Sequence, residues 1–235
     1  MKLTCLLPVR NGEEELPEYL AGVGEFADDV IALDDGSTDA TLRLLRASPL
    51  VSTVLTNPVR PSYAGWDDYA NRTRLLAAAE ASAPDWVIWI DADERLESSD
   101  AAVIRDFLQH EARRDTAYCL EVLRAIDDLE HFDKCAFWVP RLYAWRPGLS
   151  LKPLKLHLDL IPREFDATAV RRTSLRLLHK AGMDARRRQS RYDKYSESDP
   201  DREWLREEDY QRLLQAPRLR KPVLQRAASA PVLID

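Results

Sequence analysis

VIALDDGSTD at residues 30–39 and WVIWIDAD at residues 86–93 are the most informative stretches of this chain for its architecture. Each is a short apolar run that ends in aspartates, a pattern typical of a buried parallel strand that leads into a polar loop. Ligands of open α/β sheets bind beyond the carboxyl ends of the strands. The two acidic clusters should therefore face one crevice, where two close carboxylates repel by about 4 kcal/mol at an effective dielectric of about 20. We expect a divalent cation that carries a phosphorylated substrate to offset this repulsion.

The first half of the chain alternates between strand and helix patterns. We expect strands at 3–9, 30–33, 51–56 and 86–90, and helices at 14–26, 38–48 and 67–82, the second capped by Ser37 or Thr38. This order predicts an α/β fold with a parallel sheet and helices on both faces. Beyond Asp93 we expect strands at 116–125, 135–145, 154–161 and 174–179, and helices at 98–111, 184–195 and 202–214.

Composition narrows the class of protein. Of 235 residues, 45% are hydrophobic and 31% charged, which predicts a packed core rather than disorder. No apolar stretch reaches the about 20 residues that span a bilayer. Three cysteines without a CxxC pair favour a reduced, cytoplasmic protein. The net charge of −6 argues against nucleic-acid binding, whereas residues 171–191 carry eight Lys or Arg and one acid, which suggests a phosphate or an anionic acceptor.

Several of these features also have purely structural interpretations. Residues 34–39 are good turn and helix-cap chemistry, and residues 91–93 could form an exposed acidic turn. The arginines of residues 186–191 could form one solvated helix face. Arg141 could reach the cleft or only stack on a neighbouring aromatic ring, and His179 could be a core or capping histidine instead of a metal ligand.

Three motifs in this order resemble those of the family 2 glycosyltransferases, which have a GT-A fold. They are LPVRNGEE at 7–14, LDDGSTDAT at 33–41 and WIDADE at 89–94. The resemblance covers residues 3 to about 96, and residues 140–200 look more loosely like soluble bacterial members. It implies a GT-A-like, mostly parallel Rossmann-like sheet flanked by helices, with a smaller mixed acceptor-side region. The implied organisation is a nucleotide-sugar-binding half at 1–96, an acceptor-side half at 97–200, and a C-terminal helix and tail at 201–235.

The resemblance also implies a nucleotide-diphosphate-sugar donor and the residues that would bind its nucleoside. Pro8, Arg10 and Asn11 would line the base pocket. Asp35, together with Asp34, would accept hydrogen bonds from the base or the ribose.

The remaining site residues implied by the resemblance serve the sugar, the metal and the acceptor. Asp91 would approach the sugar or ribose, and Asp93 would bind Mg²⁺ or Mn²⁺, with His179 as a further metal contact. The cation would neutralise the charge that gathers on the departing diphosphate. Asp159, or else Glu164, would deprotonate the acceptor hydroxyl.

These inferences predict a metal-dependent inverting glycosyltransferase whose acceptor is a glycan, a lipid-linked sugar or a small molecule. The Gln-x-x-Arg-Trp signature of processive members is missing, which argues against a polysaccharide synthase. One alternative is a sugar nucleotidyltransferase, although residues 10–13 lack the expected Gly-rich phosphate loop and lysine. The other is a non-catalytic protein that binds nucleotide sugars. We expect no transmembrane segment, and peripheral membrane contact stays open.

Overall fold

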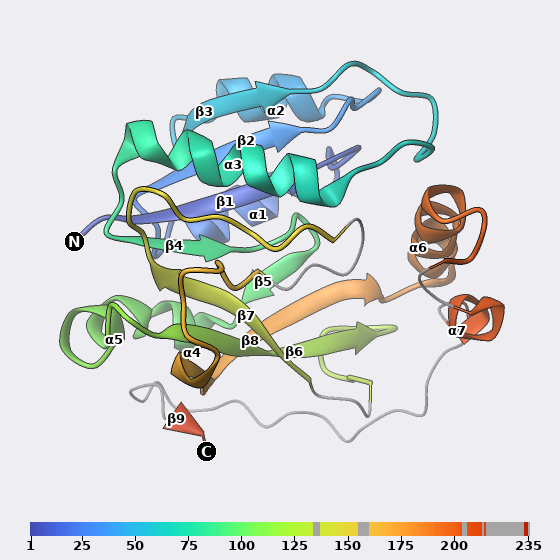
Figure 1. Ribbon diagram of the computed structural model, residues 1–235. Coiled ribbons are helices and arrows are strands. Elements are labelled where there is room, and N and C mark those ends of the chain that lie inside the picture. The colour runs from blue at the N-terminus through green and yellow to red at the C-terminus, as the bar shows by residue number, and fades with distance from the viewer. Residues whose placement is uncertain (134–136, 155–159, 204–205, 213, 215–232, 235) are drawn as a thin grey trace.

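The computed structural model describes residues 1–133, 137–154, 160–203, 206–212, 214 and 233–234. Its first half is built on four parallel strands in the spatial order β3 (Val51–Thr56), β2 (Asp29–Asp34), β1 (Leu3–Val9) and β4 (Trp86–Trp89). All residues of β2 and β4 are buried, because β1 and further strands flank them and helices cover both faces. The parallel α/β sheet predicted from the two acidic stretches is confirmed (Figure 1).

The same sheet continues beyond β4 in mixed orientation. The next strands, in spatial order, are β7 (Phe137–Ala144), β6 (Ala117–Ile126), β8 (Val170–Gly182) and β5 (Glu94–Leu96). β5 pairs with residues 177–179 of β8, and β9 (Leu233–Ile234) pairs with residues 172 and 173. β7 runs antiparallel to both β4 and β6, whereas β6 and β8 are parallel. One continuous sheet therefore joins the two halves of the chain through the contact between β4 and β7.

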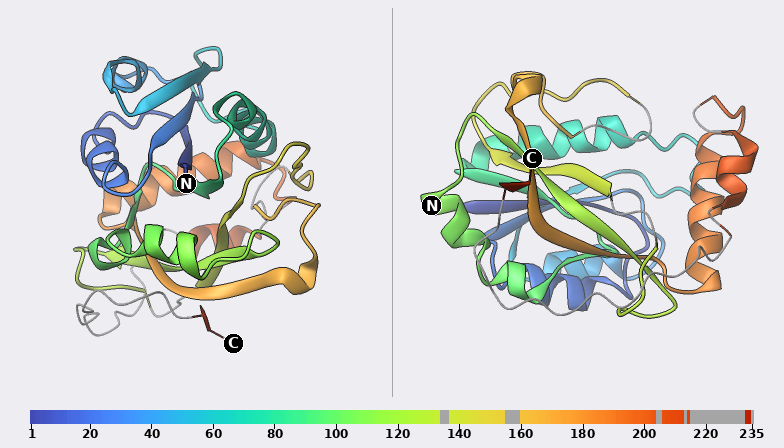
Figure 2. Two further views of the ribbon diagram at one scale, coloured as in Figure 1. Left: turned by 90° about the vertical axis from the view of Figure 1, so that its left-hand side faces the viewer. Right: turned by 90° about the horizontal axis from the view of Figure 1, so that it is seen from below.

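Helices cover the parallel strands on both sides. α1 (Leu16–Val23), α2 (Thr41–Ala47) and α5 (Ile104–His110) contribute to one apolar cluster. α3 (Asp68–Ser82) lies on the opposite face of the sheet (Figure 2). It shares an apolar cluster there with Leu151, Leu160 and Phe165. α6 (Ala185–Ser198) stands across the carboxyl ends of the parallel strands, next to α7 (Glu207–Arg212) (Figure 1). In the described part of the chain, no helix has both the length and the apolar character needed to cross a membrane.

The structure corrects several predicted elements. The helix expected at 98–111 is two helices, α4 (Ser98–Ala101) and α5. α2 begins at Thr41 without a side-chain cap, so neither Ser37 nor Thr38 caps it. β5 was not predicted, since its three residues are too short for a pattern. Of the strand expected at 154–161, the described residues 154, 160 and 161 are not in a strand, and residues 155–159 lie outside the described part.

Pro140 does not interrupt β7. β7 runs through it, and the register of β6 shifts between Tyr118 and Cys119, directly opposite Pro140. A proline has no N–H to donate to the ladder, and the extra residue of a bulge, Arg141, lies next to it on β7 itself.

Candidate functional site

A cavity of about 730 Å³ lies at the carboxyl ends of β1, β2 and β4. One part of its wall comes from the loops that follow these strands, and another from β7, β8 and α6. The lining residues include Pro8, Arg10, Asn11, Asp35, Asp91, Asp93, Arg141, His179, Arg191 and Lys194. The structure therefore brings together, from distant parts of the chain, seven of the ten site residues that the family resemblance implies.

The adjacent Asp34 and Asp35 of the first acidic cluster have different surroundings. The buried Asp34 accepts a hydrogen bond from the backbone N–H of Ser37 at 3.3 Å and is not among the residues that line the cavity. Asp35 lines the cavity and accepts hydrogen bonds from Arg60 and from the side-chain amide of Asn57. The structure thus supports the turn interpretation for Asp34 and keeps Asp35 as a candidate ligand of the nucleoside.

The loop after β1 is locked onto the loop after β2. Asn11 has a left-handed backbone, with φ of 49°, and its side-chain oxygen accepts the N–H of Thr38 at 2.9 Å. Its own N–H donates to the hydroxyl of Ser37 at 2.9 Å. The guanidinium of Arg10 lies 4.2 Å from the ring centroid of Tyr63, a stacking contact at the cavity rim.

Two arginines hold Asp91. Arg72 of α3 donates to one of its carboxylate oxygens at 2.9 Å, and Arg141 of β7 lies 3.6 Å from the other. Arg141 also donates to the buried Glu94 at 2.8 Å, and Glu94 accepts the backbone N–H of Asp91 at 2.9 Å. Arg141 therefore reaches the cleft. Burial alone would raise the pKa of Asp91, but Arg72 and Arg141 hold that pKa below its usual range, so Asp91 is ionised at neutral pH.

Asp93 and His179 meet where β5 pairs with β8. The Nε2 atom of His179 lies 3.2 Å from the Oδ2 atom of Asp93, and the backbone N–H of Lys180 donates to the Asp93 carbonyl at 2.8 Å. Burial would raise the pKa of Asp93, but His179, Lys194 and Arg191 hold it well below its usual range. Asp93 is therefore an anion ready to accept a cation.

The basic residues of α6 differ in whether they form an ion pair with a carboxylate. Arg186 pairs with Glu14, Arg187 with Glu15 and Asp184, and Arg188 with Asp127. Arg191 and Lys194 have no carboxylate within ion-pair distance among the described residues. The ammonium of Lys194 lies 4.1 Å from the ring centroid of Trp66. Burial would lower the pKa of Lys194, but Tyr195 and Asp68 raise it, so it enters the cavity as a cation.

Of the two candidate bases, only Glu164 lies in the described part of the chain, and it is not part of this arrangement. Asp159 lies outside the described residues, although the next residue, Leu160, lines the cavity. Glu164 is exposed and is not among the lining residues. It accepts hydrogen bonds from the backbone N–H of Ser150 at 2.9 Å and from the Ser150 hydroxyl at 2.6 Å.

Several functional residues were not found from the sequence. Arg72, Glu94 and Lys194 lie in stretches that look like ordinary helix or turn. The ion pair of Asp68 with Arg72, whose Nε donates at 3.0 Å, has the i, i+4 spacing that could have indicated a buried arginine on α3. Its contact with Asp91 depends on tertiary packing.

The donor set fits a divalent cation held jointly with a substrate. In the described residues no group of three or more His, Cys, Asp and Glu could hold a metal ion, so a cage made by the protein alone is not formed there. Mg²⁺ is usually bound by one or two carboxylates together with substrate phosphates and water. The ionised Asp93 and the adjacent His179 supply such a partial set, and the buried Nδ1 of His179 has no hydrogen-bond partner among the described residues.

Comparisons with known proteins identify the family of the chain. The profile described as "Glycosyl transferase family 2" matches residues 4–175, more than half of the chain. The uncharacterized protein Rv3786c of Mycobacterium tuberculosis is 26% identical over 213 residues, which cover 86% of this chain and 51% of that protein. The chain thus spans about half the length of the curated relatives it matches.

Solved structures are similar at lower identity. TarS of S. aureus is 15% identical, with a TM-score of 0.49, 91% of this chain covered and 42% of that one. Residues 1–349 of TarS, solved in complex with UDP-GlcNAc, are 14% identical, with a TM-score of 0.46, 91% of this chain covered and 70% of that one. Because the family profile matches more than half of the chain, the chain belongs to glycosyl transferase family 2.

Proposed function

We propose that this chain transfers a sugar from a nucleotide-diphosphate sugar to an acceptor hydroxyl, in a metal-dependent reaction that inverts the anomeric configuration. The observation that carries the proposal is the distribution of charge around one cavity. Asp91 and Asp93 line it together with Arg191 and Lys194, two cations without an ion-pair partner in the described part of the chain. A diphosphate between a metal ion and basic side chains would satisfy both groups of charges.

The metal would be Mn²⁺ or Mg²⁺, held by Asp93 and His179. When bound, such a cation would neutralise the negative charge that gathers on the leaving diphosphate. Arg191 and Lys194 would bind the phosphate oxygens, and the exclusion of water by Trp66 and Tyr195 would strengthen these contacts.

The nucleoside would lie at the other end of the cavity, against the loops after β1 and β2. Asp35 would accept a hydrogen bond from the base or the ribose, and Pro8, Arg10 and Asn11 would shape the pocket. Asp91 would approach the sugar or ribose, oriented by its two arginines. We do not propose that Asp34 binds the nucleoside, because its buried carboxylate accepts the backbone N–H of Ser37.

The general base is proposed to be Asp159, since a carboxylate is needed to take the proton of the acceptor hydroxyl. The position of the next residue, Leu160, in the cavity wall supports this choice. The acceptor would be a glycan, a lipid-linked sugar or a small molecule, encountered in the cytoplasm or by peripheral contact with a membrane.

A sugar nucleotidyltransferase is less well supported by the loop after β1. The N–H groups of Asn11, Gly12 and Glu13 already donate to the side chains of Ser37, Thr41 and Asp39, at 2.9, 2.7 and 3.1 Å. A phosphate-binding loop keeps such N–H groups for its ligand. The remaining alternative is a non-catalytic protein that binds nucleotide sugars. It would bind the same donor as the proposed enzyme but would not turn it over.

The test is isothermal titration of UDP and GDP into the parent and Asp93→Ala, with MnCl₂ or with EDTA. We expect the parent to bind one nucleotide more tightly with Mn²⁺. In Asp93→Ala the affinity for that nucleotide in the presence of Mn²⁺ should fall. The fall should exceed the about 10- to 100-fold caused by the loss of an outer partner of a metal ligand. Release of UDP or GDP from the matching sugar nucleotides then separates an enzyme from a binding protein.

Asp106→Ala is the matched control. Asp106 also pairs with a histidine, His110 at 2.9 Å, but on the exposed surface of α5. Its loss should leave nucleotide binding unchanged. Equal binding of nucleotide and Mn²⁺ by Asp93→Ala and by the parent would refute the metal assignment.

A further inference from the structure

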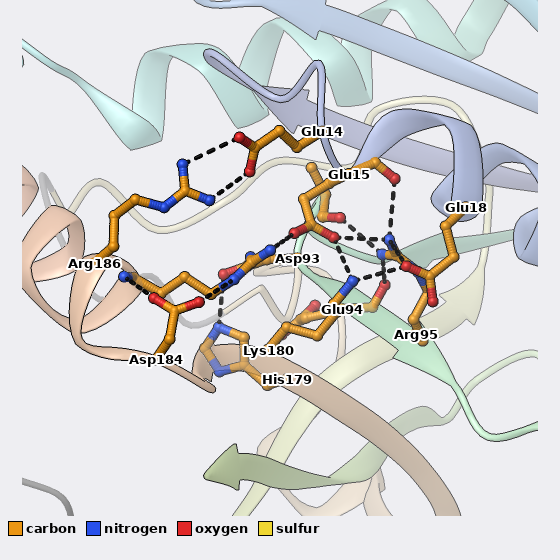
Figure 3. A network of polar contacts seen from close by, with 12 residues as sticks. Glu14, Glu15, Glu18, Asp93, Glu94, Arg95, His179, Lys180, Asp184 and Arg186 are labelled. Carbon is orange, nitrogen blue, oxygen red and sulfur yellow. Dashed lines mark hydrogen bonds and ion pairs between the residues drawn. The ribbon is translucent and has the colours of Figure 1, made fainter. Parts of the chain in front are cut away.

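Glu15 forms ion pairs with three cations that come from three different elements (Figure 3). Its carboxylate accepts hydrogen bonds from Arg95 of β5 at 3.0 Å and from Lys180 of β8 at 2.8 Å. It also pairs with Arg187 of α6. The Glu15 side chain is only 9% exposed, so these pairs are shielded from water and screened little by salt.

Local helix stability does not account for this side chain. Glu15 is the N-cap residue of α1, yet its side chain makes no capping hydrogen bond. The caps of α3 and α6 behave differently, since Asp67 accepts from Ala70 and Asp184 accepts from Arg187 in the usual way. The Glu15 carboxylate is therefore directed to residues distant in sequence and not to its own helix.

Two of its partners adjoin residues of the proposed donor site. Lys180 directly follows His179 on β8. Arg187 lies four and seven residues before Arg191 and Lys194, a spacing that places all three on one side of α6. One carboxylate thus fixes both the strand that carries the histidine and the helix that carries the two cations.

We propose that Glu15 is a positioning residue for the donor site, an inference that rests on the proposed function. By holding Lys180 and Arg187, its charge sets where His179, Arg191 and Lys194 stand relative to Asp93. Glu15 itself is not assigned a contact with the metal or the donor.

Glu18 provides a matched control within the same network. It accepts hydrogen bonds from Lys180 at 2.7 Å and from Arg95 at 3.3 Å, but it makes no ion pair with Arg187. Its side chain is 55% exposed. The two residues share Lys180 and Arg95 as partners. A comparison of Glu15→Gln with Glu18→Gln therefore measures what the ion pair with Arg187 of α6 and the burial of Glu15 add.

The experiment measures Kd for UDP and GDP in the presence of MnCl₂ by calorimetry, for the parent, Glu15→Gln, Glu18→Gln, Arg187→Gln and the double variant Glu15→Gln/Arg187→Gln. Thermal unfolding of each protein gives the folded fraction. We expect Glu15→Gln and Arg187→Gln each to raise Kd by about 10- to 100-fold per folded molecule, the range typical of outer partners of a ligand. Glu18→Gln should stay within about threefold of the parent.

The double variant should bind no more weakly than Glu15→Gln, because both changes break the same contact. A purely structural role would lower the thermal midpoint while the folded molecules of Glu15→Gln kept the parental Kd, and that result would overturn the inference. Additive effects in the double variant would overturn it too. If Glu15→Gln does not fold, the effect of Arg187→Gln alone decides. A parent that binds neither nucleotide would refute the proposed function, and this inference with it.

Discussion

Removal of the Arg72 guanidinium should destabilise the protein strongly and in a pH-dependent way. Arg72 is buried on α3, where its Nε lies 3.0 Å from Asp68 and one of its terminal nitrogens 2.9 Å from Asp91. Arg72→Met keeps an unbranched stem against the ring of Trp89, whose centroid lies 5.5 Å from the guanidinium carbon. The substitution removes the charge and leaves two carboxylates without their common partner.

The expected loss follows from two opposing terms. Unit charges about 4 Å apart attract by about 4 kcal/mol at an effective dielectric of about 20, so two carboxylates give a gross attraction of about 8 kcal/mol. Desolvation of the charges offsets several kcal/mol of this. Removal of one partner from a buried ion pair costs about 3–5 kcal/mol. Because the Asp91 side chain is 29% exposed, we expect the lower end, about 3 kcal/mol.

The loss should shrink in acid. Burial raises the pKa of Asp91, and Arg72 is the main group that lowers it. In the parent the pKa of Asp91 lies below its unfolded value, so the ionised carboxylate contributes stability at neutral pH that is lost as pH falls through the folded pKa. Without Arg72 the effect of burial is less opposed, and Asp91 takes up a proton at higher pH. The difference between the two proteins should therefore narrow from pH 7 to about pH 4.

Urea denaturation at both pH values measures these differences. Arg74→Met is the control, since Arg74 lies on the same helix but is exposed, and its hydrogen bonds go to uncharged oxygens of Thr56 and Asn57. Its loss should cost less than about 1 kcal/mol. A loss below about 1 kcal/mol for Arg72→Met at pH 7, or an equal loss at both pH values, would show that Arg72 does not stabilise ionised Asp91.

Two further predictions concern the loop after β2 and the general base. Gly36 has φ of 73°, and a Cβ there would collide with the carbonyl oxygen of Pro58, so Gly36→Ala should lower the free energy of unfolding by more than about 2 kcal/mol. Gly65→Ala, with the same φ but open space, should cost only about 1 kcal/mol in the same denaturation assay, and equal losses would contradict this. Asp159→Asn should lower turnover of the sugar nucleotide by about 100- to 10 000-fold with unchanged donor Kd, and near-parental turnover would exclude Asp159 as the base.

The first half of the fold could be predicted because its signals are local. The strand at 3–9 has the predicted bounds. β2 extends the predicted 30–33 by one residue at each end, and β4 is one residue shorter than the predicted 86–90. Each apolar run is short and uninterrupted, as expected of a strand buried on both faces. Beyond Asp93 the strands pair over long sequence separations. The extension of β8 to Val170–Gly182, against a predicted 174–179, reflects its pairing with β6, β5 and β9, which no local pattern records.

The candidate site shows the same division. Asp35, Asp91 and Asp93 follow strands, and so the rule for parallel sheets brings them to one edge. Their cationic partners could not be predicted, because Arg72 approaches Asp91 through the packing of α3. Lys194 reaches the cavity from a helix that directly follows the last long strand.

The arginines change the first expectation about the acidic clusters. A divalent cation was expected to offset their mutual repulsion, but arginines already offset part of it. Asp35 is paired with Arg60, and Asp91 with Arg72 and Arg141. Asp93 differs, since in the described part of the chain its one ion-pair partner is His179, whose charge depends on protonation. An added cation would displace no arginine or lysine from Asp93, whereas at Asp35 or Asp91 it would compete with a guanidinium. Of these three carboxylates, Asp93 is therefore the one whose charge a metal could neutralise, next to Arg191 and Lys194, which have no ion-pair partner among the described residues and would contact the diphosphate.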